Sequence, residues 1–530
     1  MVGVPGKSKG CSTCRRRKKG CDQKRPICGQ CVSSGYECGG YNRDRTFILH
    51  PATKTVRRAI FLPHSKPSPL ALPGSLNRDA VQSQCRSLFW DLYMPQGDCV
   101  CRDEHIIRCG HPMNWTEVIQ NVAKEDSSLQ DAFSALSISR VGQGNKDFRL
   151  VHESTRLYGR ALKELQLALY DPDRMHSNHV LMACMLLGLY EVFEGPAFNS
   201  KSWMAHAQGA ARLIELRGPA RHQEWDAHHP FLASRIPTLY AAILSRQATY
   251  LANEDWLTLP WEKQSRTYFD RLIDLAVHVP GIIEKFDLIL DRDQDIEFDL
   301  LQVLEECKDL QIKMNMWKDG TKGSAVPRVE KHDPTDSNGY PFETDLWFEN
   351  HLFVQARVVF YTCSLALAEA VTDIVRALDV RDHKIPDTAE PNPLLELFTP
   401  EKHATNICRT IPYCIQPEMS ALGANIINFP ANLAYAYYQR TGHKSVIKWL
   451  VKAFEDVKTR GVHVENILQG LSEISADKDV RIHRWKRASS EDTNEPGSSP
   501  GSAQTMSSCT TIFVYEDPSK SYYDASNDPG

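Results

Sequence analysis

Six cysteines near the start of the 530-residue chain have the residue type and the spacing of a metal centre. They form two copies of the pattern C-x₂-C-x₆-C, joined by six residues: Cys11, Cys14, Cys21, Cys28, Cys31 and Cys38. A C-x₂-C pair lets two thiolates reach one metal ion from a single turn, and two such pairs indicate zinc. The basic run Arg15–Lys19 lies between the second and third cysteines. The pattern therefore predicts a zinc centre that holds cationic side chains against an anion such as phosphate.

This zinc is expected to be structural. Four thiolates at about 2.3 Å from each ion give a closed tetrahedral site with no position for a reacting water molecule. A segment this short cannot bury a core of its own. Metal binding must therefore supply the folding free energy, typically ~10–16 kcal/mol for a structural zinc at neutral pH.

Two other interpretations of these residues were weighed. A disulfide-rich secreted knot is disfavoured, because residues 1–10 lack an apolar signal segment and the other ten cysteines are scattered without a paired framework. The basic run is also typical of a nuclear localisation signal, which is compatible with a role in binding nucleic acid.

The cysteine pattern resembles the fungal zinc binuclear cluster family of transcription factors, in which six thiolates hold two zinc ions. The resemblance implies that Cys11, Cys14, Cys21 and Cys28 bind one ion, and that Cys11, Cys28, Cys31 and Cys38 bind the other. Further matches are the pair Arg17-Lys18, Asp22, Pro26, Gly35 and Tyr41. Gly20 departs from the family, where many members carry a basic residue, so a phosphate contact is missing there.

The same resemblance implies how DNA is contacted. A short first helix, from about Thr13 to Lys19, would carry the basic run into the major groove, where Lys and Arg donate to guanine O6 and N7. Lys18, with Arg17 beside it, would read a short G·C-rich motif. Contacts to phosphate, which give affinity without sequence preference, are expected from Arg15, Arg16 and Lys19.

Charge divides the chain into a basic start and an acidic remainder. Residues 1–45 contain 11 Lys and Arg against 3 Asp and Glu, a net charge of +8, and the remainder carries −12. This division indicates that only the basic start meets nucleic acid. The longest strongly apolar stretch, Val180–Tyr190, is too short to span a membrane, so no membrane partner is expected.

The chain is expected to be mostly α-helical, with a small zinc module followed by a large all-α region. We assign residues 1–45 to the zinc module, 46–79 to a Pro-rich linker, 80–486 to the helical region and 487–530 to a disordered acidic tail. The linker lacks an apolar heptad, so a coiled-coil dimer through it is not supported. A dimer would form through the helical region, or the protein would bind DNA as a monomer.

Apolar residues recur at three- and four-residue steps through the central region. We expect stacked antiparallel helices in two lobes, with a loop over Lys318–Asp345 and no competing strands. The clearest expected helices are 150–169, His179–Phe193, Trp203–Leu216, Trp347–Leu378, Ala421–Gln439 and Ser445–Thr459. The segments 190–195 and 203–219 resemble the helical middle region that follows the zinc cluster in many filamentous-fungal members.

One further cluster of metal-ligand residue types lies outside the zinc module: Cys99, Cys101, His105, Cys109 and His111. Its spacing matches no common zinc site, so ordinary packed residues are the preferred interpretation and a third metal site the alternative.

The sequence therefore predicts a nuclear, DNA-binding regulator of RNA polymerase II promoters that is not an enzyme. Its expected partners are two structural zinc ions, double-stranded DNA, co-regulators or the transcription machinery, and a small-molecule effector of the helical region. The alternative is an enzyme or helical scaffold to which the zinc module adds nucleic-acid targeting. That alternative requires clustered titratable groups in a deep cleft of the helical region.

Overall fold

The computed structural model describes residues 10–24, 27–38, 74–101, 119, 126–194, 200–292, 296–321, 326–331, 339–379 and 397–459. The chain divides into two compact units, residues 1–66 and 67–530. The described part is mostly α-helical, which confirms the expected fold class.

The first unit contains two five-residue helices, α1 (Ser12–Arg16) and α2 (Gly29–Ser33). Each helix begins one residue after the first cysteine of a C-x₂-C pair. Neither helix is long enough to be stable by itself in water. The buried residues around which they pack are the cysteines Cys11, Cys14, Cys28 and Cys31.

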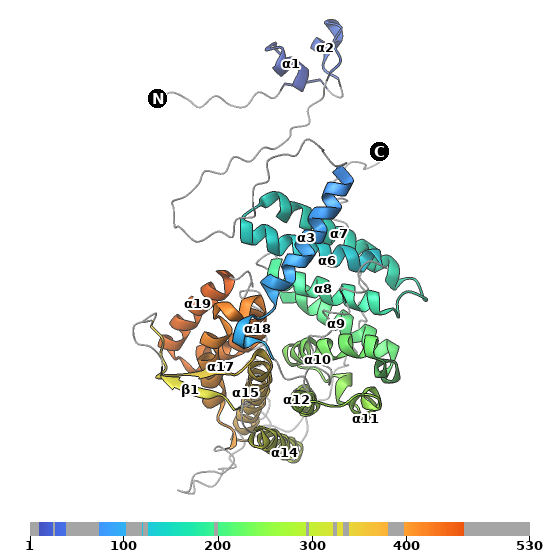
Figure 1. Cartoon of the computed structure of the whole chain (residues 1–530). Coiled ribbons are helices and arrows are strands. Elements are labelled where there is room, and N and C mark those ends of the chain that lie inside the picture. The colour runs from blue at the N-terminus through green and yellow to red at the C-terminus, as the bar shows by residue number, and fades with distance from the viewer. Residues whose placement is uncertain are drawn as a thin grey trace, which may run out of the picture. The chain divides into compact units, whose positions relative to one another are not determined.

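The second unit begins with five long helices. They are α3 (Gly74–Tyr93), α6 (Ser127–Asn145), α7 (Phe148–Leu169), α8 (Asn178–Glu194) and α9 (Ser200–Arg217). Helix α6 packs against α3, α7 and α8, and α8 packs against α9, so that α6 to α9 form successive layers (Figure 1). Helix α8 is apolar on nearly all sides, as the sequence predicts, and it lies in the middle of this stack.

The ends of these helices follow from local sequence. The Asp126 carboxylate accepts hydrogen bonds from the Ser128 and Leu129 amides at 2.8 and 3.2 Å, which starts α6. Gly218 has φ +76, a backbone conformation that favours glycine, and it follows the end of α9. The predicted stop at Arg217-Gly218-Pro219 thus coincides with the end of the helix.

The remaining helices follow after the short 3-10 turn Pro219–Gln223. Their bounds are α10 (Trp225–Ser245), α11 (Glu254–Thr258), α12 (Tyr268–Ala276), α13 (Val279–Leu290), α14 (Glu297–Gly320), α15 (His351–Asp379), α17 (Pro400–Cys414), α18 (Ser420–Thr441) and α19 (Lys444–Thr459). Further 3-10 turns are Gly97–Cys99, Tyr250–Ala252, Leu259–Trp261 and Pro417–Met419. One connected hydrophobic core runs from α3 to α19.

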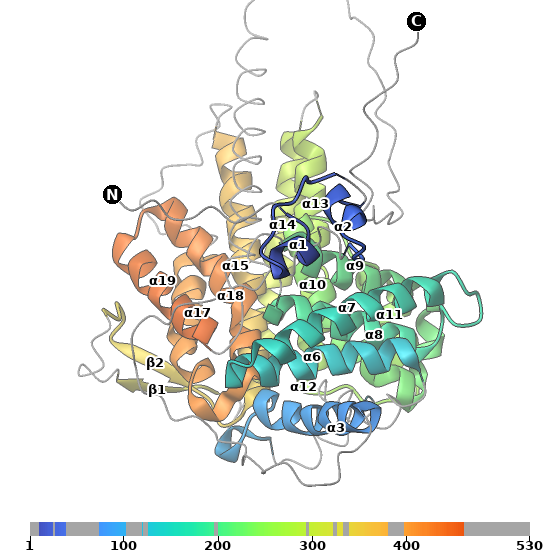
Figure 2. The same ribbon diagram turned by 90° about the horizontal axis from the view of Figure 1, so that it is seen from above.

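The expectation of a loop without strands over Lys318–Asp345 is wrong. Helix α14 continues to Gly320, and the strands β1 (Arg328–Lys331) and β2 (Thr344–Trp347) pair antiparallel, with Arg328 opposite Trp347. Strand β2 lies against α17 (Figure 2), where the Arg409 guanidinium donates to the Thr344 carbonyl at 2.9 Å. Each strand has only four residues, and β1 is fully exposed, so no apolar alternation marks the pair in the sequence.

Helix α15 also differs from the expectation. It begins at His351 and not at Trp347, which belongs to β2. Residues His351–Leu378 are long and apolar enough to cross a membrane by length and composition, so Val180–Tyr190 is not the longest apolar stretch. However, 83% of the most apolar window is buried inside the protein, which is what a central core helix requires.

Candidate zinc centre and nucleic-acid interface

The six cysteines of the first unit converge on one small volume. Two groups form, and within each group the four sulfur atoms lie within 4.8 Å of one another: Cys11, Cys14, Cys21 and Cys28 in one, and Cys11, Cys28, Cys31 and Cys38 in the other. Cys11 and Cys28 belong to both groups, and their sulfur atoms are 3.6 Å apart. Among the residues that the structure describes, these two groups are the metal-binding clusters found.

The sulfur geometry fits zinc. Four sulfurs at about 2.3 Å from a shared ion in a tetrahedron are separated by about 3.8 Å. The Cys14–Cys28 and Cys11–Cys31 sulfur pairs are 3.7 and 3.8 Å apart. All six cysteines are free thiols, and no disulfide joins the cysteines in the described ranges. This arrangement supports zinc binding by the module and argues against the disulfide interpretation.

Because these cysteines are buried, their thiolate form needs a nearby cation. Cys11, Cys14, Cys28 and Cys31 have no exposed surface. Burial raises the pKa of the Cys14, Cys28 and Cys31 thiols to about 12. A thiolate is the form that binds metal, so a divalent cation and the protons of these thiols compete for the same sulfur atoms.

Backbone amides of the module point at the sulfur atoms. The Cys14 amide donates to the Cys11 sulfur at 3.3 Å, and the Cys31 amide donates to the Cys28 sulfur at 3.3 Å. The Cys11 amide donates to the Cys21 sulfur at 3.4 Å, and the Cys28 amide donates to the Cys38 sulfur at 3.5 Å. Such contacts orient the ligands and stabilise negative charge on sulfur.

These contacts repeat with an offset of 17 residues, which is the offset between the two copies of C-x₂-C-x₆-C. After α1, the Lys19 amide donates to the Cys14 carbonyl at 3.0 Å, and after α2 the Tyr36 amide donates to the Cys31 carbonyl at 3.0 Å. Both are the closing bond of a helix end with a left-handed residue. The internal repeat of the sequence is therefore an internal repeat of the structure.

Lys18 and Gly35 occupy equivalent positions in this repeat. Each is the left-handed residue after its helix, with φ of +54 for Lys18 and +67 for Gly35. Glycine adopts this conformation without strain, whereas lysine is disfavoured there by about 1–2 kcal/mol. The first copy thus retains a strained lysine where the second copy has the relaxed residue.

The basic run lies only partly on α1. The helix ends at Arg16, so the expectation that it extends to Lys19 is wrong. Lys18 and Lys19 follow in the closing turn, and Arg16, Lys18 and Lys19 are exposed. The side chain of Arg15 lies outside the described residues. The basic run is therefore carried by a helix end with its turn, because the left-handed Lys18 stops the helix.

Arg17 differs from its basic neighbours. Its guanidinium lies 3.7 Å from the centre of the Tyr36 ring, and its side chain is half-buried. A cation over an aromatic face is held in a fixed position. Arg17 therefore links the first half of the module to the second, and no feature of the sequence pointed to Tyr36 as its partner.

Two further contacts hold the halves together. The Asp22 carboxylate accepts from the Gly29 amide at 3.0 and 3.1 Å, and the Thr13 hydroxyl donates to the Glu37 carbonyl at 2.9 Å. A Cβ at Gly29 would lie 2.6 Å from the Asp22 carboxylate, so glycine is required for this approach. The position of Asp22 after the third cysteine was noted in the sequence, but its role at the start of α2 was not. Pro26 and Tyr41 lie outside the described residues.

The second cysteine cluster predicted from sequence is only partly described. Cys99 and Cys101 are buried in the helical unit, and a ring nitrogen of His351 lies 2.8 Å from the Cys99 carbonyl. His105, Cys109 and His111 lie outside the described residues. Within the described ranges, Cys99 and Cys101 belong to no metal-binding group.

Two family models match the chain. Residues 9–46 match the fungal Zn(2)-Cys(6) binuclear cluster domain, and residues 98–320 match the fungal specific transcription factor domain. The fold and the thiol cluster define a zinc-binding module joined to an α-helical region. Both matches are domains of fungal zinc cluster transcription factors, as the sequence predicts, and they point to a regulator rather than an enzyme.

Two curated proteins are similar to parts of the chain. An uncharacterized protein of Emericella nidulans is 28% identical over 254 residues, which cover 44% of this chain and 52% of that protein. An uncharacterized transcriptional regulatory protein of Schizosaccharomyces pombe is 36% identical over 89 residues, 16% of each chain. The matched region thus spans about half of the first relative and less of the second. No solved structure matches the chain significantly.

Proposed function

We propose that this protein is a nuclear, sequence-specific DNA-binding regulator of transcription, and that the N-terminal module makes the base contacts. The two domain matches and the printed name of the Schizosaccharomyces pombe relative support this class of function. The observation that carries the base-contact assignment is the strained, exposed Lys18 at the end of α1. Backbone strain retained at an exposed cation favours a functional role for its side chain.

Two structural zinc ions complete the proposed module. Cys11, Cys14, Cys21 and Cys28 would hold one ion, and Cys11, Cys28, Cys31 and Cys38 the other, with Cys11 and Cys28 shared. The ions would supply the folding free energy that this short segment lacks. Elemental analysis of the purified protein tests the number: two zinc ions per chain are expected, and a value of one contradicts the shared arrangement.

Lys18 is proposed to read a short G·C-rich motif in the major groove, where an ammonium donates to guanine O6 and N7. Arg16 and Lys19, with Arg15, are proposed to contact phosphates on either side. Arg17, held over Tyr36, would set the position of this turn and not read bases freely. Phosphate contacts position the module, and the base contact gives preference.

The variant Lys18→Gly tests this assignment sharply. It removes the ammonium and also relieves the left-handed strain, so the module should keep its zinc and lose no stability. Binding-site selection should yield a flattened motif, with a loss of ~1–3 kcal/mol on the preferred site.

The matched control is Lys19→Ala, which removes an equal charge from the next residue. It should weaken binding to all sequences about equally and leave the motif unchanged. An unchanged motif with Lys18→Gly would show that another residue reads the bases.

The helical unit is proposed to regulate the module, to recruit co-regulators and to bind a small-molecule effector. The enzyme alternative requires clustered titratable groups in a deep cleft. The cavity detected among the described residues of the helical unit is lined by no Asp, Glu, Lys or Arg side chain. This lining favours a binding role over a catalytic role for the helical unit.

A further inference from the structure

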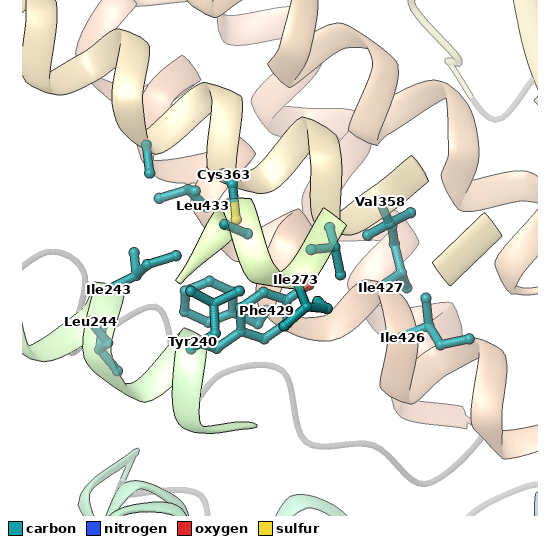
Figure 3. Packing of buried hydrophobic residues seen from close by; sticks show 14 of the residues in the cluster. Tyr240, Ile243, Leu244, Ile273, Val358, Cys363, Ile426, Ile427, Phe429 and Leu433 are labelled. Atoms are coloured by element: carbon teal, nitrogen blue, oxygen red, sulfur yellow. The ribbon is translucent and has the colours of Figure 1, made fainter. Parts of the chain in front are cut away.

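A partly open cavity of about 170 Å³ lies in the helical unit. Its walls come from α3, α8, α9, α10, α15 and α18, so helices distant in the sequence form it. Four aromatic side chains line it: Tyr93, Trp203, Tyr240 and Phe429. Tyr240 and Phe429 are stacked with ring centres 4.4 Å apart, and Figure 3 shows them between α10 and α18.

Small residues form part of the cavity lining. They include Ala207 and Ala210 of α9 and Gly188 of α8. A Cβ at Gly188 would come within 3.2 Å of the His206 Cβ, so α8 and α9 approach closely there. A larger side chain on this part of the wall would therefore press on the facing helix or reduce the volume left for a ligand.

The polar groups of the lining are uncharged at neutral pH. The Asn425 side-chain amide donates to the Tyr93 hydroxyl at 3.3 Å. His206 Nε2 lies 3.4 Å from the Tyr158 hydroxyl, which in turn donates to the Glu191 carboxylate. Burial lowers the pKa of His206 to about 4. A charged ligand would lose its hydration here without gaining an opposite charge, so the lining favours a neutral one.

Two prolines lie in helices that line the cavity. Pro237 lies inside α10 and Pro430 inside α18. Proline has no amide hydrogen, so each removes the helical hydrogen bond to the carbonyl four residues earlier. Those carbonyls belong to Ala233 and Ile426, and both residues line the cavity. A carbonyl that has lost its helical donor can accept from a ligand N–H or O–H group.

We propose that this cavity is a binding site for a small, uncharged aromatic molecule that carries one N–H or O–H donor. A cavity of ~150 Å³ accepts benzene, so the ligand has about six to ten non-hydrogen atoms. The proposal gives the chemical class of the small-molecule effector, and in that respect it rests on the proposed function. The binding chemistry itself depends only on the walls of the cavity.

Indole is a suitable probe, because it is neutral, aromatic and carries one N–H. Indene has the same shape without the donor, and indole-5-carboxylate adds a negative charge. At ten times its Kd, indole should raise the Tm of the full-length protein by about 2 °C. Indene at the same concentration should give less than half of that shift, and indole-5-carboxylate none. Equal shifts with all three probes, or none with indole, would overturn the proposal.

The variant Ala210→Leu fills the cavity from α9 and should abolish the indole shift. Its control is Gln208→Leu, which introduces the same side chain at an exposed position of α9 outside the lining and should keep the shift. If Ala210→Leu fails to fold, Met185→Phe fills the cavity from α8. A full shift retained in a folded filling variant rejects the site.

DNA binding is measured on the same proteins by fluorescence anisotropy. Wild type and Ala210→Leu should bind DNA equally in the absence of probe, because the zinc module lies outside the cavity walls. If indole does not raise the Tm of the wild-type protein and DNA binding is intact, the site is rejected and the proposed function is retained. If indole raises the Tm but the protein does not bind DNA, the proposed function is rejected and the site is retained.

Discussion

The zinc module and the helical unit obtain their stability from opposite sources. In the module the buried cluster consists of cysteines, whereas in the helical unit one apolar core connects α3 to α19. The module is basic, and the rest of the chain is acidic. The comparison indicates that the thiol cluster fixes the position of the basic run, while apolar burial builds the helical unit.

The largest expected difference is the response to a chelator. Removal of zinc should unfold the module, because metal binding contributes ~10–16 kcal/mol to its folding, and should leave the Tm of the helical unit unchanged. Limited proteolysis of the full-length protein checks this. New cleavage should appear within residues 10–38 and nowhere within helices α3 to α19 of the helical unit. The variant Cys28→Ala should act like the chelator, because it removes a shared ligand, and a stable module without metal would reject the comparison.

The helical unit should instead be sensitive to acid. Burial lowers the pKa of His222, His228 and His229 to about 4, compared with 6.5 in the unfolded chain. The unfolded state therefore binds more protons between pH 6.5 and 4, and the free energy of unfolding falls as the pH falls through this window. Each histidine can contribute up to ~3 kcal/mol by this difference.

Urea unfolding of the helical unit at pH 7.0, 6.0 and 5.0 measures this loss. The groups that face His222 and His228 include Arg217 and Arg235, whose positive charges also disfavour the imidazolium. Replacement of His222 by Gln should reduce the slope of stability against pH. A free energy of unfolding that stays constant from pH 7.0 to 5.0 would contradict the buried neutral state of these rings.

The sequence predicted the module better than the helical unit in functional detail. The spacing predicted a zinc centre, and the family resemblance implied two ligand groups that share Cys11 and Cys28, which is how the sulfur atoms are grouped in space. The assignments of base and phosphate contacts, and the domain boundaries, stay predictions. The end of α1 at Arg16 was missed, because a left-handed lysine has no sequence signal comparable to that of Gly35.

Long helices such as α8 and α18 were predicted closely, because most of their residues are buried and their sequences are therefore mainly apolar. The strands β1 and β2 were missed, since their stabilising contact comes from Arg409, distant in the sequence. The cavity could not be predicted for the same reason. Its walls depend on which residues of six helices face each other, and helical periodicity gives only the buried side of each helix.

The smallest expected effect tests the difference in charge between the basic module and the acidic helical unit. Gly20 lies in the exposed turn after the basic run, and a Cβ there would meet no atom within 4 Å. Gly20→Lys should therefore fold normally and add one phosphate contact, with a salt slope steeper by about 0.9. The control Gly20→Gln has a similar length without the charge and should leave the slope unchanged. An identical slope for both variants would place Gly20 away from DNA.

The central claim is that DNA affinity resides in the basic module. A salt titration of the full-length protein and of residues 1–66, on one DNA site and at matched oligomeric state, tests it most directly. If the module neutralises about five phosphates, log K against log salt should have a slope near −4.5 for both proteins. Between 50 and 200 mM salt this corresponds to a loss of about 500-fold. A clearly steeper slope for the full-length protein would show that the helical unit makes its own contacts with DNA, and would contradict the claim.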